Sequence, residues 1–278
     1  MRFPDAIARR VSLLALGGLA VVLTGCATPS FFERAKPSLA GSYLSGRVAA
    51  QRRMADEAAF YYERALALSP DDPALLQRAF LLDIAAGRVD AAADLAVDIL
   101  EADYDEALPH LVLAIELFRK GDYGEARARL QEGAYGPFNS AVAALMEAWT
   151  YAGEGRFEDA LDRLDANTGI EIYRGFHGLH RAMIIDLSGD LEAAAEAYRA
   201  AGRGAVAPAA ARGLGIALER SGDAAAARAL YEADIERTRR NVHAWQGLKR
   251  LDAGRAAEPF VRTASDGAAM AFFNLAAA

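Results

Sequence analysis

Two stretches decide the fold of this chain: AIELFRKGDYGEARARL (residues 114–130) and AWTYAGEGRFEDALDRL (residues 148–164). Both begin with alanine, have a glycine seven residues later, and have a second alanine five residues after that glycine. The second alanine recurs along the chain in steps of 34 or 33 residues. A constant period of this length is typical of stacked helical repeats. The recurring alanines are Ala58, Ala92, Ala126, Ala160, Ala194 and Ala227.

The glycine of each unit predicts a turn between two helices. Gly121 and Gly155 interrupt helix-favouring sequence, and Gly189 and Gly222 follow at nearly the same period. Glycine accepts the left-handed conformation that ends a helix, and an aspartate after it is suited to begin the next one. A further series, made up almost entirely of small residues, lies twelve residues before the alanines and allows paired helices to approach closely. Its members are Gly46, Phe80, Ala114, Ala148, Ala182 and Gly215.

The first unit contains a fuller signature in Ala58, Tyr62, Ala65 and Pro70. These residues and the periodic series resemble the tetratricopeptide repeat over about residues 39–241. The resemblance implies an all-α fold, in which antiparallel helix pairs form a right-handed α-solenoid of about six to seven repeats. It also implies a concave inner face. Departures from the family pattern occur at Phe80, Asn167 and Asp234.

The N-terminus predicts export and lipid attachment. Two arginines precede an almost wholly apolar run over residues 11–23, which is shorter than the roughly 20 residues of a membrane span. The Leu-Thr-Gly-Cys segment that ends at Cys26 resembles a bacterial lipobox, which implies cleavage before Cys26 and attachment of lipid to it. Cys26 is the only cysteine, which argues against disulfides and cysteine-based metal clusters. We expect a signal peptide over 1–25, and a lipidated cysteine with its tether over 26–38.

The residue after Cys26 predicts the membrane in which the protein is anchored, and the net charge bears on its partners. Ala27 stands where enteric lipoproteins retained in the inner membrane have aspartate, which favours the outer membrane and an orientation toward the periplasm. The chain has a net charge of −7 and no basic stripe with interleaved aromatic residues, so we expect no nucleic-acid partner. The tether reaches only about 40 Å when extended, which keeps the repeats near the membrane.

Motifs for catalysis are missing from the sequence. Ser188 and Ser221 precede Gly-Asp pairs at expected inter-helix turns, which explains them without a nucleophilic role. His177 and His180 lie three residues apart on an expected helix, but a zinc site needs three or four ligands. We expect surface or helix-capping roles for both histidines. We predict no enzyme activity, catalytic residue, metal site or cofactor.

An apolar stripe on the first helices of the middle units is the candidate protein-binding site. Glu147 and Arg181 occupy places in these helices that are normally apolar and buried in the family. Two interpretations stay open: the helices are rotated and the stripe is ordinary core, or it forms a concave groove for an extended peptide or an amphipathic helix. The stripe residues are Leu111, Ile115, Phe118, Leu145, Trp149, Phe176, Leu179 and Met183.

We expect the C-terminal residues 242–278 to form degenerate helices. Residues 242–251 resemble the first helix of a seventh unit, and Pro259 interrupts the expected second helix. Residues 266–278 have almost no polar face. They pack back onto the repeats, bind another chain, or belong to a longer protein; a chain end in the middle of an apparent helix favours the last of these.

These observations predict a lipid-anchored scaffold or adaptor that mediates protein–protein interaction at the bacterial outer membrane. Its partners would be one or more envelope proteins or peptides, and it would contact the membrane through its N-terminal lipid. Two alternatives remain. The chain is a self-associating structural envelope protein, or it is a repeat-containing fragment of a larger enzyme.

Overall fold

The chain divides into two units, 1–37 and 38–278, and the described part of the second unit consists of α-helices and their connections. The computed structural model describes residues 37–102, 106–166 and 174–277. The predicted signal peptide, Cys26 and nearly all of the tether lie outside the described residues. A 3₁₀ turn at Gly204–Val206 precedes α11. The α-helices are α1 (Leu39–Gln51), α2 (Ala55–Leu66), α3 (Pro73–Ala85), α4 (Val89–Glu101), α5 (Ala107–Lys120), α6 (Tyr123–Glu132), α7 (Pro137–Gly153), α8 (Phe157–Asp165), α9 (Arg174–Ser188), α10 (Leu191–Ala201), α11 (Ala207–Ser221), α12 (Ala224–Arg237), α13 (Val242–Asp252) and α14 (Ala264–Ala277).

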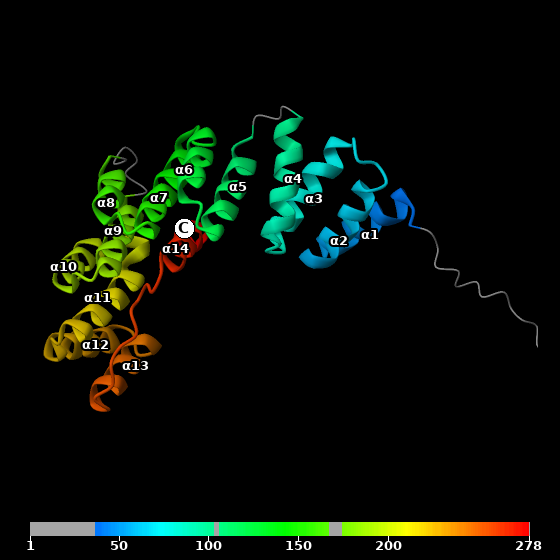
Figure 1. The fold of residues 1–278 in the computed structure, drawn as a ribbon. Helices are drawn as coiled ribbons and strands as arrows, with labels where there is room; N and C mark the ends of the chain where they lie inside the picture. The colour runs from blue at the N-terminus through cyan, green and yellow to red at the C-terminus, as the bar shows by residue number, and fades with distance from the viewer. Residues whose placement is uncertain (1–36, 103–105, 167–173, 278) are drawn as a thin grey trace, which may run out of the picture. The chain divides into compact units, whose positions relative to one another are not determined.

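The helices from α1 to α13 pack in chain order. Each of them contacts the next one, and from α5 to α13 the first helices of successive pairs also touch, as α5 and α7 do (Figure 1). This nearest-neighbour packing of helix pairs is an α-solenoid and confirms the predicted all-α fold. The right-handed sense of the solenoid stays a prediction. Within the described residues there is no strand, and no helix has both the length and the apolar character needed to cross a bilayer.

The turns within the helix pairs depend on glycines with positive φ. Gly121 ends α5 and Gly222 ends α11 in the left-handed conformation, with φ of 86° and 88°. A Cβ atom at either place would meet nothing within 4 Å. Glycine is therefore required for its backbone conformation and not for space. The other turn glycines with positive φ are Gly87, Gly155 and Gly189.

Gly121→Ala should lower the free energy of unfolding by about 1 kcal/mol, because alanine disfavours the left-handed conformation. Gly124→Ala is the matched control. Gly124 lies in the first turn of α6, where a Cβ atom would meet only the end of the Arg127 side chain, at 3.9 Å, and where alanine favours the helix. Urea unfolding should show no loss of stability in the control. Equal losses in both variants would contradict this explanation of the turn.

The periodic alanines lie in the core of each pair and are all fully buried, as predicted from their spacing. At two glycines of the earlier small-residue series, an aromatic ring from another helix fills the space that a side chain would need. A Cβ atom on Gly46 would lie 2.6 Å from the ring of Tyr62, and one on Gly215 would lie 2.5 Å from the ring of Tyr231. Gly247 of α13 also approaches Tyr231, with a hypothetical Cβ at 2.3 Å. These positions must be small because a ring from another helix occupies the space.

The helix α14 departs from the chain order. It packs against α7 and α9, although the chain reaches it from α13 (Figure 1). Residues 253–263, which connect it to α13, are not helical. Of the explanations considered for the apolar C-terminus, the structure shows the segment packed back onto the repeats. The largest hydrophobic cluster of the described residues consequently extends from α5 to α14.

Candidate protein-binding site

The predicted apolar stripe lies on α5, α7 and α9 and faces the core. Leu111 and Ile115 are partly buried, and the other stripe residues are buried. Of the two interpretations left open by the sequence, the structure has the stripe as core over α7 and α9 and not as an open groove. A contact between these residues and a partner stays a prediction. The buried members are Phe118, Leu145, Trp149, Phe176, Leu179 and Met183.

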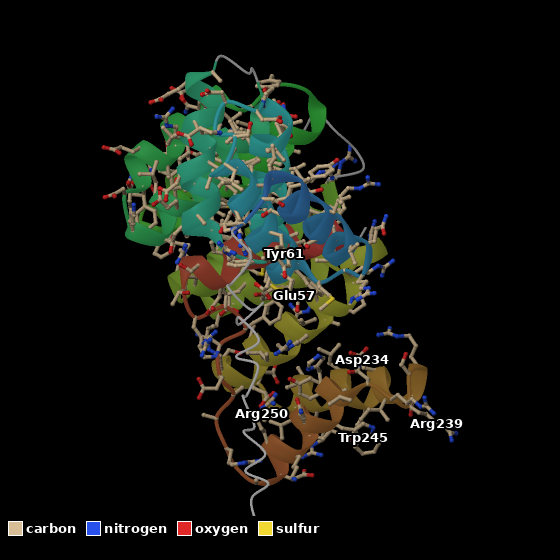
Figure 2. All side chains as sticks on the ribbon, turned by 90° about the vertical axis from the view of Figure 1, so that its right-hand side faces the viewer. Glu57, Tyr61, Asp234, Arg239, Trp245 and Arg250 are labelled. Atoms are coloured by element: carbon tan, nitrogen blue, oxygen red, sulfur yellow. The ribbon has the colours of Figure 1, made fainter. Side chains whose placement is uncertain are left out.

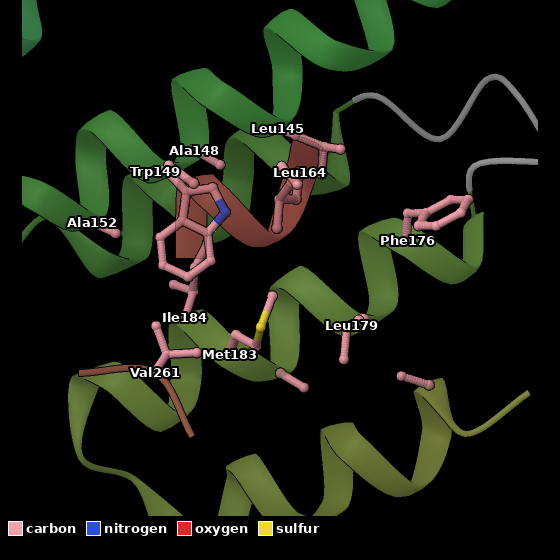
Figure 3. Packing of buried hydrophobic residues seen from close by; sticks show 14 of the residues in the cluster. Leu145, Ala148, Trp149, Ala152, Leu164, Phe176, Leu179, Met183, Ile184 and Val261 are labelled. Atoms are coloured by element: carbon pink, nitrogen blue, oxygen red, sulfur yellow. The ribbon is translucent and has the colours of Figure 1, made fainter. Parts of the chain in front are cut away.

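The C-terminal segment covers part of the stripe at Trp149. A Cβ atom on Gly267 of α14 would lie 2.1 Å from the Trp149 ring, so the helix approaches as closely as glycine allows. Val261, just before α14, is buried in the same cluster as Met183 and Ile184 (Figure 3). The chain thus places its own C-terminal residues on the face that the sequence suggested for a partner.

Trp149 is oriented by a buried histidine. Its Nε1 donates a hydrogen bond to Nδ1 of His180 at 2.9 Å, and the two rings meet edge to face at 5.8 Å. Burial lowers the pKa of His180 to about 3, so the imidazole is neutral. Its proton then lies on Nε2, which has no hydrogen-bond partner among the described residues. The predicted surface or capping role of His180 is wrong, because this side chain is fully buried.

The depressed pKa of His180 predicts acid sensitivity. The unfolded chain, with a pKa near 6.5, binds the proton more readily than the folded protein does. The contribution of neutral His180 to stability is therefore complete above pH 6.5. It is lost as the pH falls toward about 3, by up to about 1.4 kcal/mol per pH unit. His180→Asn should flatten the dependence of the unfolding free energy on pH between about pH 6 and about pH 5, as urea denaturation can measure. Equal slopes in the two proteins would exclude His180 as the cause.

The charged residues at normally apolar places form ion pairs between neighbouring helices. Glu147 of α7 is buried and pairs with Nε of Arg163 on α8. Arg181 of α9 donates to both carboxylate oxygens of Asp165 on α8, at 3.0 and 2.8 Å. Pairing compensates for the cost of burying the Glu147 charge, whereas the pair of Arg181 and Asp165 lies at the surface.

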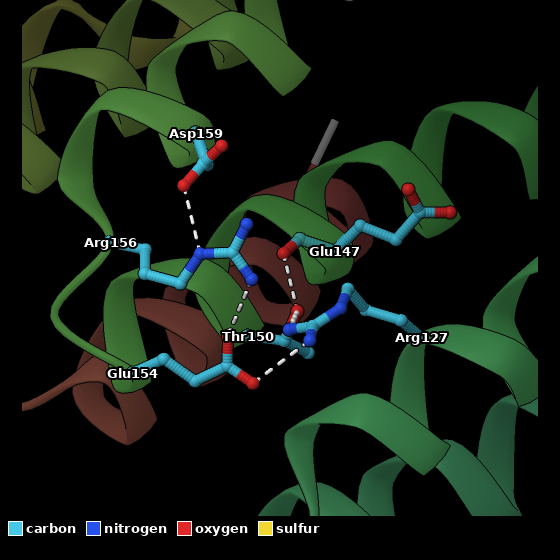
Figure 4. Close-up of polar contacts among 6 residues, drawn as sticks. All are labelled: Arg127, Glu147, Thr150, Glu154, Arg156 and Asp159. Atoms are coloured by element: carbon cyan, nitrogen blue, oxygen red, sulfur yellow. Dashed lines mark hydrogen bonds and ion pairs between the residues drawn. The ribbon is translucent and has the colours of Figure 1, made fainter.

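A second network surrounds Tyr151 of α7. The guanidinium groups of Arg127 and Arg156 lie 4.3 and 4.6 Å from the centre of its ring. Both arginines also pair with Glu154, at 2.9 and 3.2 Å, and Arg127 donates to Thr150 Oγ1 at 3.1 Å (Figure 4). The hydrogen bond from Arg127 is the main reason that the pKa of Glu154 is lowered. The carboxylate is therefore ionised and positions the two arginines around the ring.

A buried triad of tyrosine, carboxylate and arginine recurs in the later pairs, and the sequence analysis missed it. Tyr198 donates to Asp186 at 3.1 Å, and Arg220 of the next pair forms an ion pair with the same carboxylate. Burial raises the pKa of Asp186, while Arg220 and Tyr198 oppose that rise. The carboxylate precedes its tyrosine by twelve residues in both triads, a spacing that was visible in the sequence. The second triad consists of Tyr231, Glu219 and Arg250, with bonds of 2.6 Å to each Glu219 partner.

Asp83 of α3 is a buried carboxylate whose pKa is raised to near neutral pH. Its side chain is fully buried, and Nε of Arg88 lies 3.3 Å from it. Burial is the main cause that raises its pKa to about 7, and Glu63 adds to the rise. Glu63 also forms an ion pair with Arg88, so the three side chains link α2 to the turn between α3 and α4.

The first helix pair exposes hydrophobic side chains. Leu44 and Val48 of α1 and Met54 before α2 are exposed around a surface hollow of about 350 Å³. Tyr61, labelled in Figure 2, also lines this hollow. The outer surface of α1 therefore has no helix packed over it within the described residues.

The last repeat helix, α13, also exposes a hydrophobic face. Val242 is 60% exposed and Trp245 is 54% exposed. The indole Nε1 of Trp245 donates to the carbonyl oxygen of Arg239 at 3.1 Å, which holds the ring in place (Figure 2). A tryptophan that is held in one orientation and half exposed is typical of a protein contact surface. Neither α1 nor α13 was part of the predicted site.

A surface cavity of about 550 Å³ lies among α10, α11, α12 and α13. Its lining includes Leu230, Arg212, Arg237 and His243. Arg237 is already paired with Asp234, which also lines the cavity. Across the described residues, no group of three or more histidine, cysteine or acidic side chains is placed to hold a metal ion.

The fold defines the described part of the chain as an α-solenoid of helix pairs. No protein-family profile matches it, and no curated protein matches it. YrrB, a TPR protein with an unusual peptide-binding site, is similar over 59% of this chain and 84% of its own, with 17% identity and a TM-score of 0.45. A chain in the structure of Naa15/Naa10 bound to HypK-THB is similar over 86% of this chain and 37% of its own, with 21% identity and a TM-score of 0.47.

Proposed function

We propose that this protein is a lipid-anchored scaffold that binds other envelope proteins and has no catalytic role. In this proposal Cys26 carries the lipid, and the repeats face the periplasm from the outer membrane. The observation that carries the scaffold function is the exposed face of α13 with Val242 and Trp245. Large apolar side chains exposed side by side usually mark an interaction surface, and tryptophan is enriched at the centres of such surfaces.

The polar side chains of the described core support a role in binding instead of chemistry. The carboxylates of Asp186 and Glu219 are each bonded to a tyrosine and an arginine from neighbouring helices. An acid or base in catalysis must reach its substrate, whereas these groups are enclosed between helices.

The exposed faces of α1 and α13 also favour a second candidate function, in which copies of the protein associate with each other.

Cys26→Ala should abolish lipid attachment and release the protein from membranes. Labelled palmitate fed to a Gram-negative bacterium that expresses the chain should enter the wild type and not the variant. Separation of inner and outer membranes on a density gradient then tests the location. Incorporation of label into the Cys26→Ala variant, or wild type recovered only in the soluble fraction, would contradict the anchor.

Photo-crosslinking in living cells tests the scaffold function at α13. A photoreactive residue at Trp245 should give one defined adduct with another envelope protein, because this ring is the centre of the proposed surface. The same residue at Gln131, an exposed position on α6, is the control and should give none. An adduct between two copies of the chain would favour self-association. Absence of any adduct at Trp245 would contradict the scaffold surface proposed there.

A further inference from the structure

The C-terminal segment packs on the repeats in two parts, an irregular stretch and the helix α14. Its first part, before α14, has no helical structure and places Phe260 against Tyr198, with ring centres 6.1 Å apart in an edge-to-face arrangement. The guanidinium group of Arg212 lies 5.3 Å from the centre of the Phe260 ring. Val261 follows and is buried in the main hydrophobic cluster. An irregular anchor with two consecutive apolar residues thus leads into the helix.

The helix α14 presents one face of small residues to α7 and α9. Ala264, Gly267, Ala268 and Ala271 follow the spacing of a single helix face, and all are buried. Gly267 lies directly on the Trp149 ring, where any side chain would collide with it. The opposite face is exposed at Ser265, Ala269 and Phe273. The fit between this face and Trp149 therefore depends on the absence of side-chain bulk in α14.

The start of α14 is stabilised by bonds within the segment itself. Asp266 Oδ2 accepts from the backbone N–H of Arg262 at 3.0 Å, and the N–H of Asp266 donates to Thr263 Oγ1 at 3.1 Å. These bonds do not depend on contact with the repeats. The segment thus contains its own helix-start signal. Gly267 contacts the Trp149 ring, and Ala268 and Ala271 are buried in the same hydrophobic cluster as Trp149.

Resting on the scaffold function proposed above, we propose that residues 258–273 occupy a partner-binding groove over α7, α9 and α11. The partner inserts a segment of the same chemistry: an irregular stretch with an aromatic and a branched apolar residue, then a helix with glycine or alanine on one face. This partner helix displaces α14 and lays its small residues on Trp149. The part of the apolar stripe at Trp149 is then a binding surface that the chain itself covers in the free state, and the irregular connection over residues 253–263 allows the exchange.

The test uses the full-length chain and a fluorescent peptide of residues 258–273. Gly267→Leu in the chain should expel α14, because the new side chain collides with Trp149. Ala269→Leu, on the exposed face of the same helix, is the matched control. The peptide should bind Gly267→Leu at least about tenfold more tightly than the wild type or the control, since the competing segment no longer occupies the groove. A peptide that itself carries Gly267→Leu should not bind.

Equal peptide affinity of all three chains would overturn the proposal. A wild-type chain that sediments as a dimer, with Gly267→Leu monomeric, would also overturn it, because the occupant would then be α14 of a second copy. Hydrogen exchange of the wild type decides the question even when that variant does not fold. Amides of α14 should exchange faster than those of α7, and equal protection of the two helices would mean that α14 is permanent core. The peptide assay needs no cellular partner, so its failure leaves the crosslinking result at Trp245 intact.

Discussion

The close approach of a tyrosine ring to two glycines is the contact on which the later repeats depend. Tyr231 lies against Gly215 of its own pair and against Gly247 of the next pair. One ring therefore sets the separation of helices both within a pair and between pairs. Its hydroxyl reaches Glu219, which also binds Arg250 from α13, so the polar joint forms only when the ring is seated.

The sequence allowed prediction of the features that depend on residues close together in the chain. The period, the left-handed turn at Gly121 and the burial of the alanines follow from helix geometry and from the conformational freedom of glycine. The docking of α14 was not predictable in the same way. Its residues lack a polar face, a pattern equally suited to the core, to a partner or to further sequence. The choice depends on its fit to Trp149, far earlier in the chain.

Charge placement was the least predictable part of the candidate site. Glu147 and Arg181 looked like departures from an apolar position, yet each is satisfied by a side chain on α8. His180 looked like a surface residue because a histidine at helical spacing carries no sign of its partner. Its hydrogen bond to Trp149 arises only when α7 and α9 lie side by side. Such pairs depend on which helix faces meet, and a single sequence does not specify that directly.

The position of α14 changes how stability is distributed along the array of helix pairs. In a repeat protein with contacts only between neighbours, stability is nearly a sum over units, and either end can open alone. Here α14 connects the end of the chain to α7 and α9, and the helices from α5 onward share one hydrophobic cluster. The contact of α14 with α7 and α9 therefore adds a long-range contribution to the stability of this half, beyond the sum over neighbouring units. The pairs from α1 to α4 lack such a closing contact within the described residues, and they can open one at a time.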